Sequence, residues 1–458
     1  MKRKDLNSVS FSAFLEPLIK DLVRLKTEFI QLDGGFSVKI ELQSVVADNL
    51  GSNELSGVCR GFTGDACRFC DKKLKDLKYD YSTVAEESIY CVRTVKNSAF
   101  RLLTVSPYLF PFDLFHDFAC SGIMQRVLGP IIKRYYIESE NQTGRNDLRR
   151  FEKLKSELFD RLDSLSKDRI SDISNKGLIE GKGCQVIEFF LLFGYLDEIV
   201  PRDSDLWKLY LSIRNIYLFA SAEMIPKDKL AAFQDEVNSF LNNYIKFVVR
   251  ENLESFVFKL HYLVHYRRAI EHFGPLALYS TVKYERGHQI HKRGDSNSNQ
   301  FKNKAYSLAK RCALGFQVDF KVLDFEVKKQ IKFQELSSAE HSSYQHLFKP
   351  DADVEVLKWL KLQKVFYKKN LVFRIVDENL IEPPTFVKIV FVAKQEDDFY
   401  MVATKLKTLD YRPERVCYKV EHTLEVVRVT NDMIHYHNLF YHSRDSSVLK
   451  SFYLKTDF

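Results

Sequence analysis

The chain has 458 residues, enough for about two to four domains, and it is 45% hydrophobic and 28% charged, so it can build packed cores and is not a disordered protein. Its 17 glycines and 11 prolines are too few for a collagen-like or low-complexity protein. The formal net charge of +8 is a mild basic excess, compatible with a polyanionic partner but not evidence for one.

Export and membrane insertion are not expected. The basic start, Met1–Lys4, is not followed by the apolar core of a signal peptide. The longest apolar stretch, Val186–Leu196, is much shorter than the about 20 residues that cross a bilayer. The eight cysteines are dispersed apart from one Cys-x-x-Cys, which favours reduced thiols in an intracellular protein. The basic start could serve as a short nuclear signal, and a solvated terminus explains it equally well.

The N-terminal elements indicate a helix followed by strands. Residues 11–29 carry apolar side chains at helical spacing, and residues 36–42 then alternate as in a half-buried strand. The apolar run Val45–Ala47 predicts a short buried strand that ends at Asp48. An acidic residue just past a buried strand is where α/β folds place chemistry, although most such residues simply begin a turn.

The middle of the chain, from about 139 to 255, predicts helices. Two helical stripes of apolar residues are expected in the core: Leu206, Leu209, Tyr210, Ile213 and Tyr217, then Leu230, Phe233, Val237, Phe240, Leu241 and Tyr244.

The last part of the chain predicts a small antiparallel β-domain, barrel-like in form. Its expected strands are Leu371–Val376, Phe386–Val392, Phe399–Leu406, Cys417–Val420 and Leu424–Val429. Residues 395–398 are expected to form the turn between the second and third of these strands.

Cys67 and Cys70 have the spacing of metal ligands. A structural zinc site would need two more ligands, for which Cys59, Cys91 and Cys120 are candidates. The alternative is a pair of reduced, buried thiols, and we favour that interpretation because no second Cys-x-x-Cys is present.

Several histidines gather between residues 261 and 291. His261 and His265 are four positions apart on a predicted helix, as metal ligands can be, but the metalloprotease pattern His-Glu-x-x-His is not met. Packing of the two imidazoles at a helix interface is the interpretation that we favour.

Three groups of residues resemble CACTA (EnSpm-like) DNA transposases and their animal relatives. The first combines Ala47–Gly51 with Cys67–Cys70, and the second is Pro111–Asp117. The third and most specific runs from Lys259–Tyr266 through His272–Leu276 and Lys283–His288, and is continued by Asn303 and Leu308–Arg311. The resemblance extends from about residue 15 to the C-terminus and is weakest in the β-region.

The resemblance implies an RNase H-like core that performs two-metal catalysis, in which carboxylates hold two Mg²⁺ ions at the attacking and leaving oxygens. It implies that Asp48 is the second catalytic aspartate and Glu285 the catalytic glutamate, so that these two would bind Mg²⁺. It implies that Asp113 and His116 form the family's auxiliary motif. From the residues alone, Asp48 could be a turn residue, Glu285 an exposed helical acid, and Asp113 a helix N-cap beside a partly buried His116.

The family's first catalytic aspartate is expected upstream of Asp48, where only 47 residues precede it and no credible counterpart occurs. We therefore expect an α+β fold with an incomplete RNase H-like core, an all-helical insertion and a C-terminal antiparallel β-domain. The expected boundaries are 1–130 for the partial core, 131–255 for the insertion, 256–315 for the segment carrying Glu285, and 316–458 for the β-rich domain.

The expected function is that of a transposable-element-derived protein, truncated or domesticated, that lacks transposase activity and retains DNA binding. The candidate DNA-binding residues surround Glu285 and are Lys283, Arg286, Lys292, Arg293, Lys302 and Lys304. An ordinary solvated helix face is the alternative for this cluster. The alternative functions are an active transposase or nuclease whose start is truncated, and a non-enzymatic protein-interaction module.

Overall fold

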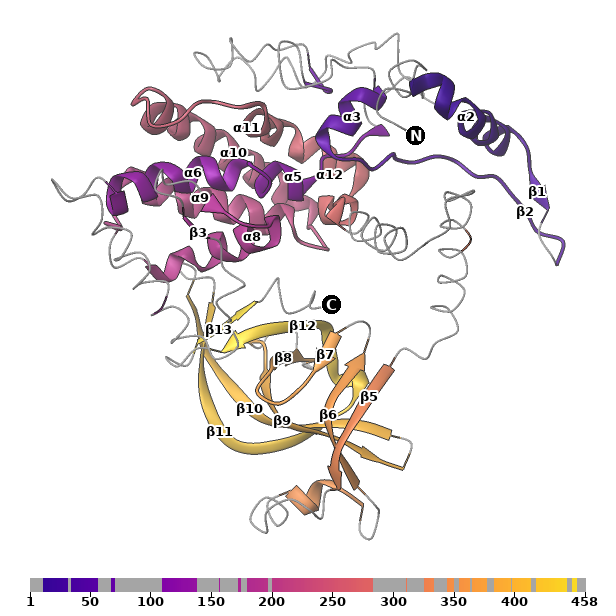
Figure 1. Ribbon diagram of the computed structural model, residues 1–458, viewed down its shortest axis with the longest axis vertical. Helices are drawn as coiled ribbons and strands as arrows, with labels where there is room; N and C mark the ends of the chain where they lie inside the picture. The colour runs from indigo at the N-terminus through magenta and orange to yellow at the C-terminus, as the bar shows by residue number, and fades with distance from the viewer. Residues whose placement is uncertain are drawn as a thin grey trace, which may run out of the picture. The chain divides into compact units, whose positions relative to one another are not determined.

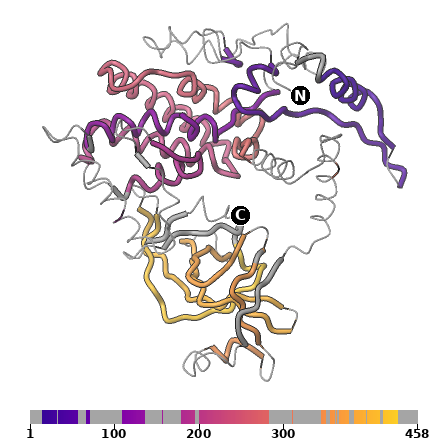
Figure 2. The backbone as a smooth tube through the Cα atoms, viewed as in Figure 1, coloured from indigo at the N-terminus to yellow at the C-terminus, as the bar shows by residue number. Residues whose placement is uncertain are grey.

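The computed structural model describes these residues: 11–31, 34–56, 67–70, 109–137, 156, 172–173, 179–196, 200–282, 310, 325–332, 344–349, 354–362, 365–376, 383–396, 398–412, 417–442 and 447–450. The remaining residues are drawn in grey in Figure 2. The chain divides into two compact units. Unit 1 comprises Met1–Tyr135, Lys176–Leu178 and Val200–Ile290, and unit 2 comprises Tyr136–Asn175, Ile179–Ile199 and His291–Phe458.

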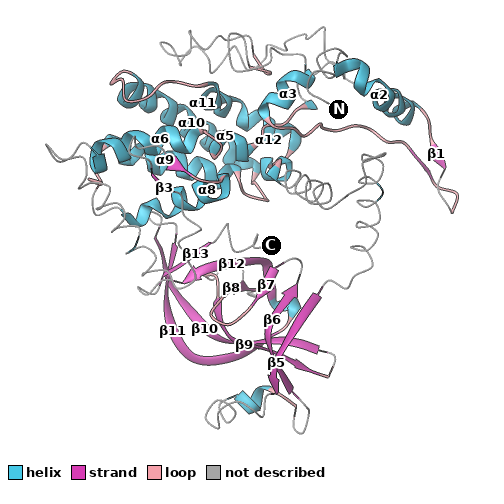
Figure 3. Ribbon diagram, viewed as in Figure 1, coloured by secondary structure: helices cyan, strands magenta, loops and turns pink. Residues whose placement is uncertain are grey.

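The described part of unit 1 is mainly helical, as the cyan ribbons of Figure 3 show. Its α-helices, labelled in Figure 1, are α2 (Phe11–Thr27), α3 (Asn49–Ser56), α5 (Leu114–Phe118), α6 (Ile123–Ile132), α9 (Asp205–Ala220), α10 (Leu230–Tyr244), α11 (Phe258–Tyr262) and α12 (Tyr266–Phe273). Shorter 3₁₀ and π-helical turns are η4 (Lys133–Ile137, which crosses the unit boundary), η7 (Lys227–Lys229), η8 (Ile245–Val249), η9 (Leu263–His265) and η10 (Leu276–Tyr279).

The core of unit 1 is built around α9, which packs against both α6 and α10. Both predicted apolar stripes are confirmed, because every residue named in them is buried. Phe219 of α9 stacks on Phe233 of α10 with ring centroids 4.6 Å apart. Ser204 caps the start of α9 by accepting a hydrogen bond from the backbone NH of Trp207. The α10 helix in turn packs against η9 and α12, so the site described below rests on a helical core.

The N-terminal helix is confirmed as α2, the strand predicted at 36–42 is confirmed only for two residues, and the strand predicted at 45–47 is wrong. Strand β2 covers only Ser37–Val38 and pairs with β1 (Ile30–Gln31), while residues 39–48 have no regular secondary structure. A strand persists only where a neighbouring strand pairs with it along its length. In the described part of the chain, no strand pairs with residues 45–47. The backbone NH of Val45 makes one isolated hydrogen bond, to the carbonyl of Leu109.

Unit 2 begins with a two-residue ladder between β3 (Asp172–Ile173) and β4 (Ile179–Glu180). The predicted apolar stretch at 186–196 forms α8 (Gly183–Leu192) and η6 (Phe193–Leu196). No helix within the described ranges combines the length and the apolar character of a membrane span.

The remainder of unit 2 contains an antiparallel sheet of nine described strands. They are β5 (Phe325–Lys332), β6 (Val354–Leu362), β7 (Val365–Tyr367), β8 (Val372–Ile375), β9 (Phe386–Gln395), β10 (Asp398–Arg412), β11 (Cys417–Val429), β12 (Ile434–His442) and β13 (Ser447–Lys450). Two short 3₁₀ turns, η12 (Gln345–Leu347) and η13 (Asn431–Met433), lie beside them.

The sheet closes on itself, which confirms the expected barrel-like β-domain. Its order runs β10-β11-β13-β12-β8-β9, and β9 also pairs with β10, so these strands form a closed ring. The five predicted strands correspond to β8, β9, β10 and β11. The first prediction, 371–376, is one residue longer than β8 at each end, and the last two predictions are one continuous strand, β11. The expected turn at 395–398 joins β9 to β10, with Glu396 in the left-handed region at φ 57°.

The α+β class is thus confirmed, but the described residues do not show an RNase H-like core. The described two-stranded ladders, β1–β2 and β3–β4, are two residues long, and the large sheet is antiparallel throughout. The predicted RNase H-like core therefore stays an expectation from the resemblance.

Candidate metal centre

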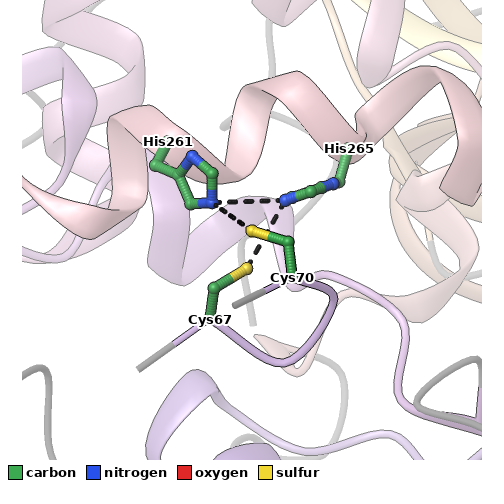
Figure 4. Close-up of side chains that lie close together, drawn as sticks. All are labelled: Cys67, Cys70, His261 and His265. Atoms are coloured by element: carbon green, nitrogen blue, oxygen red, sulfur yellow. Dashed lines mark hydrogen bonds between the residues drawn. The ribbon is translucent and has the colours of Figure 1, made fainter. Parts of the chain in front are cut away.

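Four side chains that could bind a metal meet in the interior of unit 1. They are Cys67, Cys70, His261 and His265, and their ligand atoms all lie within 4.8 Å of one another. All four residues are buried. In Figure 4 the two cysteines approach from one loop and the two imidazoles from the helix facing it. Among the described residues, this Cys2His2 cluster is the only group of three or more His, Cys, Asp or Glu side chains spaced to hold an ion.

Local structure explains why each half of the cluster converges. His261 lies on α11 and His265 on η9, within a continuous helical segment, and a spacing of four places both on one face. Cys67 and Cys70 lie in the bend Cys67–Cys70, whose central Phe69 stacks on Phe112 with ring centroids 4.5 Å apart. The two pairs of ligands come from distant parts of the chain: Cys67 and His265 are 198 positions apart, and Cys70 and His261 are 191 positions apart.

The distances suit a tetrahedral ion. Nε2 of His265 lies 3.4 Å from Sγ of Cys67, Nε2 of His261 lies 3.2 Å from Sγ of Cys70, and the two Nε2 atoms are 3.2 Å apart. Zinc bonded to two thiolates and two imidazoles separates neighbouring ligand atoms by about 3.3–3.8 Å. The cluster therefore needs only small adjustments to enclose zinc.

The protonation states also suit a metal. Burial opposes ionisation of Cys67, but the Cys70 thiol and the imidazoles of His265 and His261 together hold the pKa of Cys67 well below its usual value. Burial lowers the pKa of His265, which favours the neutral form of this imidazole. A thiolate and a neutral imidazole are the forms that bind zinc.

The structure thus joins two motifs that the sequence left separate. Cys67 and Cys70 are buried and form no disulfide, as we expected. His261 and His265 are buried too, but their imidazoles face the cysteine loop instead of a neighbouring helix. The ligands that complete the cysteine pair are these histidines. Cys120 does not belong to the cluster, and Cys59 and Cys91 lie outside the described residues.

Asp113 is a helix N-cap, as its position in the sequence allowed. Its carboxylate accepts from the backbone NH of Phe115 at 3.1 Å and lies 2.6 Å from Nδ1 of His116, which is partly buried. Thr281 adds two further bonds to this carboxylate, from its hydroxyl and from its backbone NH. Asp113 therefore joins α5 to the residues that follow η10. The auxiliary role that the resemblance implies for Asp113 and His116 stays a prediction.

Asp117, one turn after Asp113, is a buried acid that the sequence did not single out. Its carboxylate accepts from the side-chain nitrogen of Asn49 at 2.6 Å and from the hydroxyl of Tyr266 at 2.7 Å. Burial raises the pKa of Asp117 to about 6, against the two hydrogen bonds that favour its charged form. Nearby, the Lys259 ammonium donates to the carbonyls of His116 and Cys120, which fastens α11 to the end of α5.

Asp48 caps the start of α3, since its Oδ1 accepts from the backbone NH of Gly51 at 2.7 Å. Glu285, its expected partner in magnesium binding, lies outside the described residues. So do the candidate DNA-binding residues Lys283, Arg286, Lys292, Arg293, Lys302 and Lys304. The predicted magnesium site and DNA-binding face therefore stay predictions.

No model of a known protein family matches the chain. A search of curated proteins gives no significant match either. The arrangement of side chains, together with the resemblance in short segments, is thus the basis for a functional proposal.

Proposed function

We propose that this chain is a zinc-stabilised, DNA-binding protein of transposase descent. The observation that supports descent is the contact among the three segments on which the resemblance rests. Asn49 of the first segment bonds Asp117 of the second, and Tyr266 of the third bonds the same carboxylate. Cys67 lies against His265. A core inherited from a CACTA transposase has to keep these segments together, and they are together here.

The metal in this proposal is a structural zinc ion held by Cys67, Cys70, His261 and His265. A catalytic zinc keeps one coordination position open for water, whereas a structural zinc is enclosed by four protein ligands. Here four protein donors converge in a buried place, so zinc would supply a cross-link between distant segments and no reactive water. The proposal extends to DNA binding and assigns no strand cleavage.

Metal analysis tests the zinc part. The purified wild-type chain should contain one zinc ion, and cobalt in its place should give the absorption of a tetrahedral site with thiolate ligands. The Cys70→Ser variant should lose both, because a hydroxyl is a poor ligand for these ions. Cys184→Ser in α8 is the matched control, and it should keep both. Metal-free wild-type protein that also fails to take up cobalt would contradict the zinc site.

Binding to a labelled DNA duplex of random sequence tests the second part. Contacts with phosphates release counterions, so affinity should fall steeply as salt rises. The absence of binding at low salt, or an affinity that salt leaves unchanged, would rule out the proposed nucleic-acid role and leave the zinc site standing.

A further inference from the structure

Arg68 lies between the two cysteines of the metal centre, yet its side chain reaches helix α3. Nη1 donates to Oδ1 of Asn53 at 2.9 Å and to Oδ1 of Asn49 at 3.3 Å, and Nη2 lies 3.4 Å from the same Asn49 oxygen. The residue is fully buried. Asn49 and Asn53 are one turn apart, so a single guanidinium spans the first turn of α3.

Helix α3 buries a polar face instead of the apolar face that most helices bury. Its buried residues are all polar: Asn49, Ser52, Asn53 and Ser56. Its leucines contribute less, since Leu50 is 46% exposed and Leu55 is only partly buried. Hydrophobic packing fixes most surface helices to their core. The position of α3 depends instead on the hydrogen bonds that its polar face makes.

The charge of Arg68 also depends on this arrangement. No carboxylate in the described part of the chain bonds Arg68 directly. The counter-charge is Asp117, which is reached through Asn49: the Asn49 oxygen accepts from Arg68, and its nitrogen donates to Asp117. The rings of Phe112 and Tyr262 lie 5.3 and 5.5 Å from the guanidinium carbon. Asn49 therefore has to stay in place for both buried charges to be satisfied.

We propose that Arg68 is a positioning residue that makes the placement of helix α3, and of Asp48 at its start, depend on metal at the Cys2His2 cluster. This inference rests on the zinc site proposed above. Phe69 stacked on Phe112 keeps the loop near the core in either state. The metal would add bonds to Cys67 and Cys70, which lie on either side of Arg68 in the sequence. These bonds would fix the backbone of the loop from which the Arg68 side chain extends.

The metal would also affect the position of Asp48, because hydrogen bonds join Asp48 to the first turn of α3. The carboxylate of Asp48 accepts from Gly51 in the first turn, and its carbonyl accepts from the backbone NH of Ser52. With metal bound, Arg68 holds Asn49 and Asn53, and the first turn of α3 stays closed. Without metal, the loop can turn the guanidinium away, and the polar face of α3 then exchanges its protein partners for water.

Hydrogen exchange of the full-length protein tests the inference. In the wild type, removing the metal with a chelator should speed amide exchange in α3 by about tenfold or more, because the turn opens locally. In Arg68→Met, which keeps the apolar stem, α3 should exchange equally fast with and without metal. Arg68→Lys should restore part of the metal dependence. Helix α10 should stay protected in every sample, which reports intact folding.

Asn53→Ala serves as a second variant because it removes the acceptor on α3 and leaves the loop unchanged. It should also weaken the metal dependence of α3. Cobalt absorption reports occupancy of the cluster separately, and Arg68→Met should bind cobalt as the wild type does. This readout separates a lost coupling from a lost metal.

The outcomes are distinct. If the wild type binds cobalt but chelation does not alter amide exchange in α3, the coupling is overturned and the metal site stands. The same holds if both Arg68→Met and Asn53→Ala keep the full metal dependence. Wild-type protein that does not bind cobalt would overturn the coupling and the zinc site together. If Arg68→Met does not fold, Arg68→Lys and Asn53→Ala decide the question.

Discussion

The side-chain nitrogen of Asn49 lies 2.6 Å from Oδ1 of Asp117, although the residues are 68 positions apart. This bond connects the start of α3 to the end of α5 inside the protein. The acid at one end is buried, and the groups that face it are Tyr266, Lys259, Asp113 and Asn49. Its ionisation should therefore be visible in the stability of the whole unit.

Asp117 should make the protein lose stability as the pH rises from about 4 to about 6. Its pKa is raised from 3.8 to about 6 on folding, so the folded state holds the proton more tightly and is favoured at low pH. A shift of this size corresponds to about 3 kcal/mol at most. Urea unfolding of wild type and Asp117→Asn at each pH measures it, since other titrating groups cancel in the difference. A difference that does not vary with pH would refute the raised pKa.

Metal should stabilise the protein through its two histidines as well as its cysteines. An ion that binds only the folded state, at a free concentration about 100 times its dissociation constant, adds about 2.7 kcal/mol. Thermal unfolding with zinc and with chelator should therefore differ for the wild type. The difference should vanish in His265→Ala and persist in His272→Ala, which alters a histidine outside the cluster. Equal midpoints for the wild type in both conditions would count against the site.

Thr281→Val should destabilise the protein by about 1–3 kcal/mol, because it removes a hydroxyl that donates to the buried carboxylate of Asp113. The two side chains have nearly the same shape, so the loss reports the hydrogen bond. Thr27→Val, at an exposed helix end, is the control and should change stability by less than about 0.5 kcal/mol. Chemical denaturation decides the matter, and equal losses in both variants would argue against a specific bond.

DNA affinity should fall when Lys292, Arg293 and Lys302 are all replaced by alanine. Phosphate contacts carry no sequence information, so binding to every duplex should weaken alike, and the dependence of affinity on salt should become less steep. The measurement is a titration of labelled duplexes at several salt concentrations.

The control for that experiment removes the same charge from exposed lysines elsewhere, at Lys227, Lys229 and Lys246. It should bind DNA as the wild type does. If both triple variants lose affinity equally, net charge and not the predicted face governs binding.

The sequence predicted those helices and strands that are held in place by buried apolar residues. The stripes of α9 and α10 were found because their buried apolar residues recur at helical spacing. Strands β8 to β11 were found as short runs rich in apolar residues, although burial along them does not alternate regularly. The strand predicted at 45–47 failed because an apolar run does not reveal whether a partner strand lies beside it. Helix α3 was missed for the opposite reason, since its buried residues are polar and give no apolar stripe.

The metal centre was predictable only in halves. Cys67 and Cys70 showed ligand spacing, and so did His261 and His265, and each pair lacked what the other supplies. One sequence does not state which distant segments meet. The buried roles of Arg68 and Asp117 were equally out of reach, because each depends on partners supplied by other elements.

The distance along the chain between the halves of the metal centre has a consequence for biosynthesis. A ribosome adds about 5–20 residues per second, so the 198 positions from Cys67 to His265 take about 10–40 s. During that interval the nascent thiols have emerged without their histidine partners. Oxidants and thiol-seeking metals such as copper can react with the thiols during that interval, and the proposed zinc ion could be enclosed by all four ligands only after nearly all of unit 1 has been synthesised.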